Sequence, residues 1–160
     1  MRAGAVLAAV LIAGGAAAQE RTSLVSREIH VAGEVRHELA LTVEQLRGLA
    51  QRRGFARAGG YGGLRLTELL LEADIRQDAR NALRRTYVVA RSTDGYVAVF
   101  SWGELFNSAL GPLVLVAFER DGDPLRDGEG AIALVSLADE RIGARHVKWL
   151  SRIEVQRVRE

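Results

Sequence analysis

The sequence predicts a single α+β domain in which short, mostly antiparallel strands are interspersed with short helices. Two kinds of local pattern support this class: several short runs of alternating apolar residues, and two stretches that carry helix-start signals. The order of these elements lacks the regular strand–helix–strand repeat of a parallel sheet. With 160 residues, the chain is long enough to bury the core of one domain.

The first 18 residues have the pattern of a secretory signal peptide. Arg2 forms a short positive region, residues 3–12 are apolar, and Ala16 to Ala18 provide a small-residue cleavage site. The apolar run is too short and too rich in alanine and glycine for a membrane span. We therefore expect export, signal removal and a soluble mature domain over residues 19–160, with no membrane insertion after cleavage.

The composition excludes several kinds of site. The chain contains no cysteine, which rules out disulfides, thiolate metal sites and cysteine nucleophiles. Basic residues slightly outnumber acidic ones, 22 to 20, and the arginines are scattered, so a nucleic-acid surface is not expected. His30, His37 and His146 lie far apart and do not have the spacing of metal ligands.

The first half of the chain predicts a hairpin followed by a capped helix. Residues 24–31 and 35–41 alternate between apolar and polar and read as two strands that turn near Gly33. Thr42 and Gln45 form a capping-box pattern at the start of a helix that ends near Gly54.

The next stretch, residues 54–64, contains five glycines and reads as a loop. Its glycines do not match a phosphate-binding pattern. Glycine has high conformational freedom, so we expect this loop to be loosely held until a ligand packs against Tyr61. A short amphipathic helix over residues 66–73 and a helical turn over residues 78–83 are expected to follow.

A β-hairpin over residues 86–102 is the central feature of the chain. The runs on either side of Ser92–Gly95 favour strands, and Asp94-Gly95 provides turn chemistry. The tip of this hairpin is polar and aromatic, which suits a small-ligand site. Trp102 follows at once, beside a helix with a second capping-box pattern from Ser101 to Glu104.

The second half of the chain predicts three more strands. Residues 113–118 and 132–137 are continuous apolar runs and indicate strands buried on both faces, with a turn at residues 120–124 between them. Residues 146–158 read as a final strand, with Val147, Trp149, Ile153 and Val155 on alternate positions.

These segments together resemble the sulfite-oxidase-type molybdopterin-binding domain in a short, exported form. The matches include an Asp-Gly-Tyr-x-x-x-Phe-Ser-x-x-Glu-Leu segment and a closing Gly-x-Arg-x-Val-Lys-Trp-Leu segment. The segments that resemble the family keep its order along the chain: Val31–Val35 with Leu41–Leu46, Tyr61–Leu66, Asp94–Leu105, Gly122–Leu125 and Gly143–Val155. The resemblance implies a sulfite-oxidase-like fold with mixed, mostly antiparallel sheets.

The chain departs from the family's catalytic members at the metal ligand. Those members hold molybdenum through a cysteine in a loop that corresponds here to about residues 53–60, and this chain has no cysteine. Serine or glycine cannot replace a thiolate as a soft anionic ligand. The family's Gly-x-Pro-x-Arg-x-x-x-Pro strand is also eroded. Sulfite-type oxidation is therefore not expected.

Cysteine-less members of the family imply a different role. They are periplasmic pterin-binding proteins that relay a signal to a partner, such as the periplasmic domain of a membrane enzyme of cyclic-di-GMP turnover. By resemblance we expect a non-catalytic pterin-binding protein of this kind. Two alternatives stay open: a molybdopterin-dependent oxidoreductase that lacks the usual cysteine, and a protein-interaction module with a vestigial pocket.

The expected ligand is a tetrahydropterin-like pterin, or molybdopterin held without a protein thiolate. A pterin has two donors on one edge, which a carboxylate accepts bidentately, and Asp94 is our candidate for that carboxylate. An aromatic side chain would stack on the ring, and a basic one would meet the carbonyl or the hydroxylated tail. The candidate ligand-binding residues are Tyr61, Arg91, Asp94, Tyr96, Trp102, Arg145, His146 and Lys148.

Overall fold

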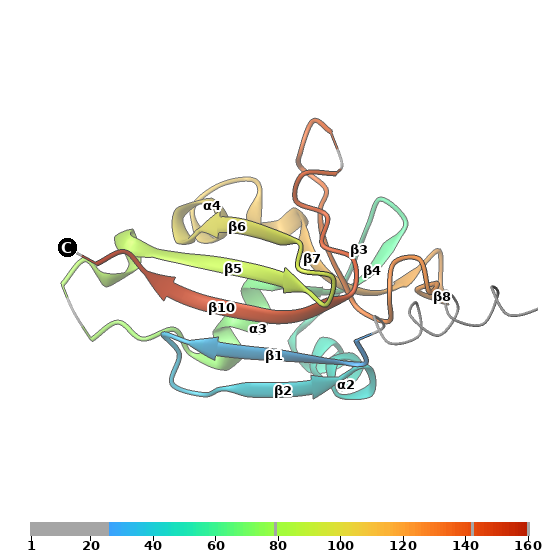
Figure 1. Cartoon of the computed structure of the whole chain (residues 1–160), viewed down its shortest axis with the longest axis horizontal. Helices are drawn as coiled ribbons and strands as arrows, with labels where there is room; N and C mark the ends of the chain where they lie inside the picture. Colours follow the sequence, from blue (N-terminus) through green and yellow to red (C-terminus); the bar gives the residue numbers. More distant parts are fainter. Residues whose placement is uncertain (1–25, 79, 142, 160) are drawn as a thin grey trace, which may run out of the picture.

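A computed structural model describes residues 26–78, 80–141 and 143–159. The expected signal peptide lies outside these residues. None of the helices in the described ranges is both long enough and apolar enough to cross a membrane. Two five-stranded sheets enclose the main core. In the view of Figure 1 the first sheet is nearest the viewer, and the helices lie behind it.

The first sheet joins strands from both halves of the chain. β1 pairs in parallel with β10, while the other neighbours in this sheet are antiparallel. Both hairpins expected from the sequence, β1–β2 and β5–β6, are present. In order across the sheet the strands are β2 (Leu39–Thr42), β1 (Glu28–Gly33), β10 (Leu150–Arg157), β5 (Thr86–Ser92) and β6 (Val97–Ser101).

The second sheet is antiparallel and is built around β7 (Val114–Arg120). Val114, Val116 and Phe118 of β7 point into the main core, whereas Leu115 and Ala117 point into a smaller cluster on the other face. This confirms the predicted strand that is buried on both faces. The other strands are β3 (Phe55–Ala58), β4 (Tyr61–Arg65), β8 (Asp123–Pro124) and β9 (Ala133–Ser136), the last paired with β7.

Both predicted capping boxes form. In each, the N-cap hydroxyl accepts from the backbone of the third helical residue, whose side chain reaches back to the N-cap backbone. Thr42 caps α2 and Ser101 caps α4, which fixes where each helix leaves the preceding strand. The helices are α2 (Val43–Arg53), α3 (Leu66–Ala73) and α4 (Trp102–Phe106), with 3₁₀ turns η1 (Ala82–Arg85) and η2 (Gly111–Leu113).

The prediction of a glycine-rich loop at residues 54–64 was wrong. This stretch is the β3–β4 hairpin, and its turn is made by Gly59 and Gly60 at φ of 56° and 82°. Gly63 allows close strand pairing, because a Cβ there would lie 2.1 Å from the carbonyl oxygen of Val116 on β7. Tyr61 is only 5% exposed. The expected ligand-ordered loop is therefore already an ordered hairpin in which Tyr61 is buried.

Other boundaries differ from the prediction: β2 begins at Leu39 rather than residue 35, because Val35 forms an isolated bridge with Ile75. The last strand begins at Leu150 rather than His146, because Trp149 has a φ of 48° that breaks the alternation. The helical turn lies at Ala82–Arg85 instead of residues 78–83. These differences depend on backbone geometry and tertiary contacts that the apolar pattern does not report.

We predict opposite effects for two glycine-to-alanine substitutions. Gly63→Ala would force β4 away from β7 and should lower the free energy of unfolding by about 1–3 kcal/mol, the usual cost of overpacking. Gly48→Ala lies inside α2, where a Cβ meets only the end of the Arg52 side chain at 3.5 Å. It should raise the free energy of unfolding by about 0.5–1 kcal/mol. Urea denaturation of both variants measures the two changes, and equal effects would contradict this account.

Candidate functional site

The segment of residues 143–149 lies between the tip of the β5–β6 hairpin and β9. The backbone amide of Thr93 donates to the carbonyl of Trp149 at 3.0 Å, and the Tyr96 hydroxyl donates to the carbonyl of Ala144 at 2.8 Å. On the other side, Val147 forms a backbone bridge with Leu134 of β9. The tip of the β5–β6 hairpin is thereby held against the 143–149 segment.

The hairpin tip presents a carboxylate and an aromatic ring. Asp94 accepts hydrogen bonds from the Ser92 hydroxyl and from the backbone amide of Tyr96, the latter at 3.0 Å. The Ser92 hydroxyl, followed by the Tyr96 amide, lowers the pKa of Asp94, so the carboxylate is ionised at neutral pH. The Tyr96 ring is 44% exposed while its hydroxyl is fixed to Ala144. Lys148 on the neighbouring segment is also exposed.

A polar cluster lies around the buried Tyr61, with Arg120 on its exposed side. The Tyr61 hydroxyl donates to Glu129 at 3.3 Å and accepts from Arg120 at 3.1 Å. The Arg120 guanidinium bonds Glu129 at 2.9 Å and lies 4.9 Å above the Tyr61 ring. Burial, more than the nearby Glu129, raises the pKa of Tyr61. Because Arg120 covers the ring, the predicted ring-stacking face of Tyr61 is occupied by the protein itself.

His146 packs against the same cluster. Its ring lies nearly perpendicular to that of Tyr61, with centroids 5.8 Å apart, and its Nε2 lies 3.3 Å from a Glu129 oxygen. Burial lowers the pKa of His146 more strongly than Glu129 raises it, so the ring is neutral at pH 7. Beside this cluster the turn after β7 encloses a cavity of about 360 Å³, lined by Arg120, Asp121, Asp123, Pro124, Leu125, Arg126 and Glu129.

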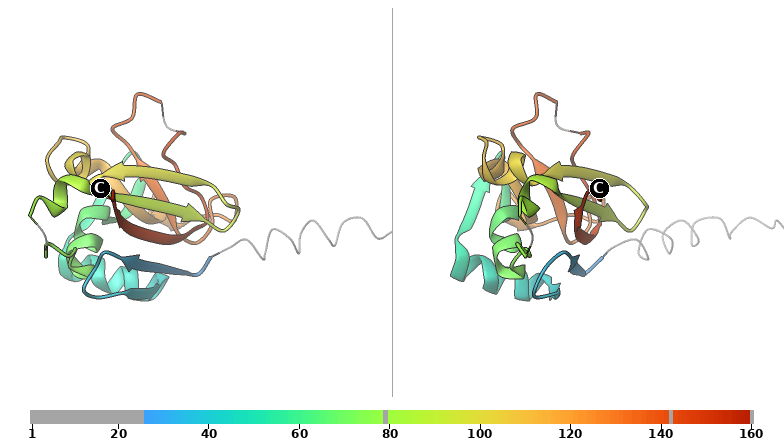
Figure 2. Two further views of the ribbon diagram at one scale, coloured as in Figure 1. Left: turned by 60° about the vertical axis from the view of Figure 1, so that its left-hand side comes forward. Right: turned by 90° about the vertical axis from the view of Figure 1, so that its left-hand side faces the viewer.

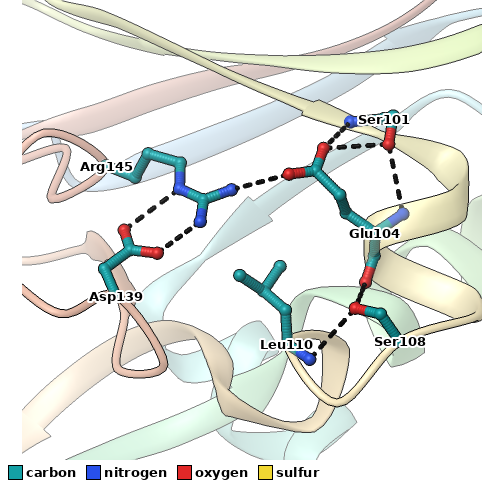
Figure 3. Close-up of polar contacts among 6 residues, drawn as sticks. All are labelled: Ser101, Glu104, Ser108, Leu110, Asp139 and Arg145. Atoms are coloured by element: carbon teal, nitrogen blue, oxygen red, sulfur yellow. Dashed lines mark hydrogen bonds and ion pairs between the residues drawn. The ribbon is translucent and has the colours of Figure 1, made fainter.

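Arg145 connects the 143–149 segment to α4 (Figure 3). Its Nε lies 3.0 Å from Asp139, a second nitrogen bonds the other Asp139 oxygen, and its third nitrogen lies 3.1 Å from Glu104. The guanidinium also lies 5.0 Å above the Phe100 ring. All three nitrogens of Arg145 therefore hold carboxylates, and its visible role is to anchor the segment.

The side chains of two of the predicted site residues do not join this group. Trp102 is at the other end of β6 and stacks on Phe106 with ring centroids 5.3 Å apart. Arg91 is ion-paired with Glu154 of β10 at 3.2 Å. The structure thus brings Asp94, Tyr96 and the 143–149 segment together, with Tyr61 packed behind His146.

The sequence reasoning missed the carboxylates that hold this region together. Glu129 bonds Tyr61 and Arg120, and Asp139 bonds Arg145. Their local sequences read as turns, and their partners are brought to them by the tertiary fold. One signal was available for Glu129, which stands between two glycines. Gly130 lies so close to Trp149 that a Cβ would meet the indole ring at 2.7 Å.

Comparison with known proteins identifies the family. Residues 50–160 match the family model described as the oxidoreductase molybdopterin binding domain. The chain belongs to this family. It is 31% identical over 138 residues to the mitochondrial sulfite oxidase of Rattus norvegicus and 30% identical over 136 residues to that of Mus musculus. Each match covers 82% of this chain and 24% of the relative, so the chain spans about a quarter of their length.

A solved structure shows the same fold. The sulfane dehydrogenase SoxCD from Paracoccus pantotrophus superposes with a TM-score of 0.58 at 21% identity, over 80% of this chain and 37% of that chain. The sulfite-oxidase-like fold expected from the sequence is thereby confirmed.

The residues present do not fit a molybdenum ion held by a protein thiolate. The sequence contains no cysteine. Across the described residues, no three histidine, aspartate or glutamate side chains gather in a group that could hold a metal. The groups that remain near the 143–149 segment are a carboxylate, aromatic rings and cationic side chains, which suit the organic part of a molybdopterin better than its metal.

We predict that Arg145→Gln destabilises the fold in a pH-dependent way. The bonds from Arg145 hold the pKa of Asp139 below its ordinary value of 3.8. A depressed carboxyl pKa stabilises the fold above that value, and this contribution is lost as the pH falls through the folded-state pKa. At pH 7 the substitution should lower the free energy of unfolding by about 1.5–3 kcal/mol, the scale for hydrogen bonds to charged groups.

The difference between the wild type and Arg145→Gln should begin to shrink below about pH 4, where Asp139 of the unfolded chain takes up a proton, and should shrink further as the pH falls through the lower pKa of Asp139 in the folded protein. Denaturation at a series of pH values tests this. Arg152→Gln is the matched control, because Arg152 pairs with Glu154 at 3.0 Å on the exposed face of the first sheet. Its loss should stay below about 1 kcal/mol. Equal losses in the two variants would show that the ion pairs of Arg145 contribute no more to stability than an ordinary surface ion pair.

Proposed function

We propose that this chain is a non-catalytic pterin-binding protein whose binding surface is formed by the β5–β6 tip and the 143–149 segment. One observation carries the proposal. In a molybdopterin-binding family member without cysteine, the Tyr96 hydroxyl and the Thr93 amide hold the polar hairpin tip against the segment that bears Lys148.

The chemistry of the surface suits a tetrahydropterin-like ring. The ionised Asp94 can accept both donors on one edge of the heterocycle, in the way that a carboxylate accepts any planar fork of donors. The Tyr96 ring, held by its hydroxyl and 44% exposed, offers a face for stacking. Lys148 can meet the carbonyl oxygen or an anionic tail. In this proposal, Arg145 and His146 position the segment, while Tyr61 packs behind it.

The proposal includes a location and a partner. Residues 1–18 direct export, the mature protein acts in the periplasm, and pterin binding is relayed to the periplasmic domain of a membrane enzyme of cyclic-di-GMP turnover. The signal-peptide pattern and the resemblance to cysteine-less family members support these assignments.

A second candidate is an oxidoreductase that carries the complete molybdopterin cofactor without a protein thiolate. The observation that favours it is the similarity to curated proteins named sulfite oxidases. Elemental analysis separates the two candidates. The pterin-binding proposal expects molybdenum far below one atom per chain in purified protein. Stoichiometric molybdenum together with sulfite turnover would replace the proposal with this second candidate.

Calorimetry with tetrahydrobiopterin tests the proposed ligand contact. Asp94→Asn places an amide donor against the donor edge of the pterin. Affinity should fall by about 2–4 kcal/mol, the scale for breaking a charge-assisted pair, while the melting temperature changes little. Asp121→Asn is the matched control, since Asp121 is an exposed carboxylate on the turn after β7. Unchanged affinity in Asp94→Asn would leave Asp94 with only its role in the turn.

A further inference from the structure

β6 is an apolar strand at the edge of the first sheet. Among the described residues only β5 pairs with it, and its other side carries no strand (Figure 2, left view). Its Ala98 side chain is buried, whereas Val97 and Val99 are 39% and 51% exposed. A strand of this kind is a surface on which another strand can pair.

The backbone of β6 has hydrogen-bonding groups that point away from β5. In an antiparallel pair, residues that exchange backbone hydrogen bonds alternate with residues that do not. The Ser92 amide donates to the Tyr96 carbonyl at 3.0 Å, so in this register the even-numbered residues of β6 bond to β5. Val97 and Val99 therefore direct their amides and carbonyls outward, at the free edge of the sheet.

These outward groups have no partner within the described part of the chain. Ser101 faces the edge in the same way, and its amide donates to Glu104 at 2.7 Å instead of to β5. α4 then turns to the core side of the sheet (Figure 2, right view). Arg145 approaches β6 from that side too, above a buried ring of the strand. The edge-facing amides and carbonyls of the two valines accept and donate no hydrogen bond to any described residue.

The other sheet edges are protected in ways that β6 is not. β3 carries Arg57, and β8 is only two residues long and ends in Pro124. Val147 bridges to β9, and β2 exposes no large apolar side chain. Charges, prolines and covering segments are the usual means by which proteins prevent edge strands from pairing. The sequence of β6, Val-Ala-Val-Phe-Ser, contains neither a charge nor a proline.

We propose that β6 pairs in an antiparallel manner with β6 of a second copy of this chain, across a two-fold axis at Ala98. In this register Val97 lies opposite Val99 of the second copy, and the reverse, so all four outward groups of each strand are bonded. The two neighbouring registers lose hydrogen bonds. They place a valine opposite Ser101 or Gly95, whose amides are already used within the chain.

The side chains agree with this register. Opposite residues of an antiparallel pair project from the same face, so the exposed valines of both copies would form one apolar cluster on the open face of the joined sheet. No charged residue of β6 would meet its own copy across the axis. The contact involves one short strand from each copy, so we expect a weak dimer with a dissociation constant on the order of micromolar.

The register also determines what lies beside the hairpin tip. Gly95 of one copy would face Ser101 of the other, so each proposed pterin surface would border α4 of the second copy. Only this consequence rests on the proposed function. The tests of the dimer use no pterin, and their failure would leave pterin binding untouched.

Sedimentation of the purified mature chain, residues 19–160, tests the association. The mass should rise from monomer to dimer as the concentration passes through the micromolar range. Val99→Lys should weaken the dimer by about tenfold or more, because it places like charges near the axis and lysine opposes edge pairing. Val158→Lys is the matched control, since Val158 is 58% exposed and lies after β10. It should dimerise as the wild type does, and both variants should keep the thermal unfolding of the wild type.

A single introduced cysteine tests the register, because the chain contains no cysteine of its own. In Ala98→Cys the two thiols would face each other in a non-bonded pair, with Cα atoms about 4.5 Å apart, within the reach of a disulfide. In Val99→Cys the two thiols would be diagonal neighbours about 7–8 Å apart, at or beyond that reach. With oxidised glutathione as the oxidant, Ala98→Cys should form a covalent dimer much faster than Val99→Cys.

Three results would overturn the proposal. One is a chain that stays monomeric well above micromolar concentration. Another is a dimer that Val158→Lys weakens as much as Val99→Lys does, because the contact would then lie elsewhere on the molecule. The third is equal rates of cross-linking in the two cysteine variants, which would exclude the two-fold axis at Ala98.

Discussion

The close approach of β4 to β7 at Gly63 is the constraint on which the second sheet depends. The carbonyl of Val116 occupies the place where any side chain at position 63 would begin. This contact lets β4 pair with β7, and β7 separates the two apolar clusters of the molecule. It also places Tyr61, at the start of β4, beside Glu129 and Arg120. The polar cluster that supports the 143–149 segment thus follows from the absence of one Cβ.

Local signals were enough to predict most of the fold. The capping boxes at Thr42 and Ser101, the turn at Gly95 and the continuous apolar run of β7 each depend on neighbouring residues, and each was confirmed. The glycine-rich stretch was misread because glycine serves both loose turns and tight strand contacts. Only the position of β7 decides between these uses, and that position is a tertiary property.

The sequence predicted which motifs lie together, but it did not predict the residues that support this arrangement. The sequence pointed to Asp94, Tyr96 and the 143–149 segment, which the structure does bring together. It also grouped Trp102 with them, although the length of β6 carries Trp102 to the opposite end of the strand. Glu129 and Asp139 were not predicted, because the local sequence around a carboxylate in a turn does not show which distant arginine it will pair with. The chain belongs to the molybdopterin-binding family, yet it contains no cysteine that could bind the metal as a thiolate.

The parallel pairing of β1 with β10 has a consequence for how the protein is made. β10 lies between β1 and β5 at the middle of the first sheet, yet it follows every other described strand in the sequence. Until residues 150–157 are available, the β1–β2 and β5–β6 hairpins have no strand to join them, and the main core stays open on one side. Contacts between the two ends of a chain form slowly because a long loop must close first. The first sheet can therefore be completed only after residues 150–157 have been synthesised.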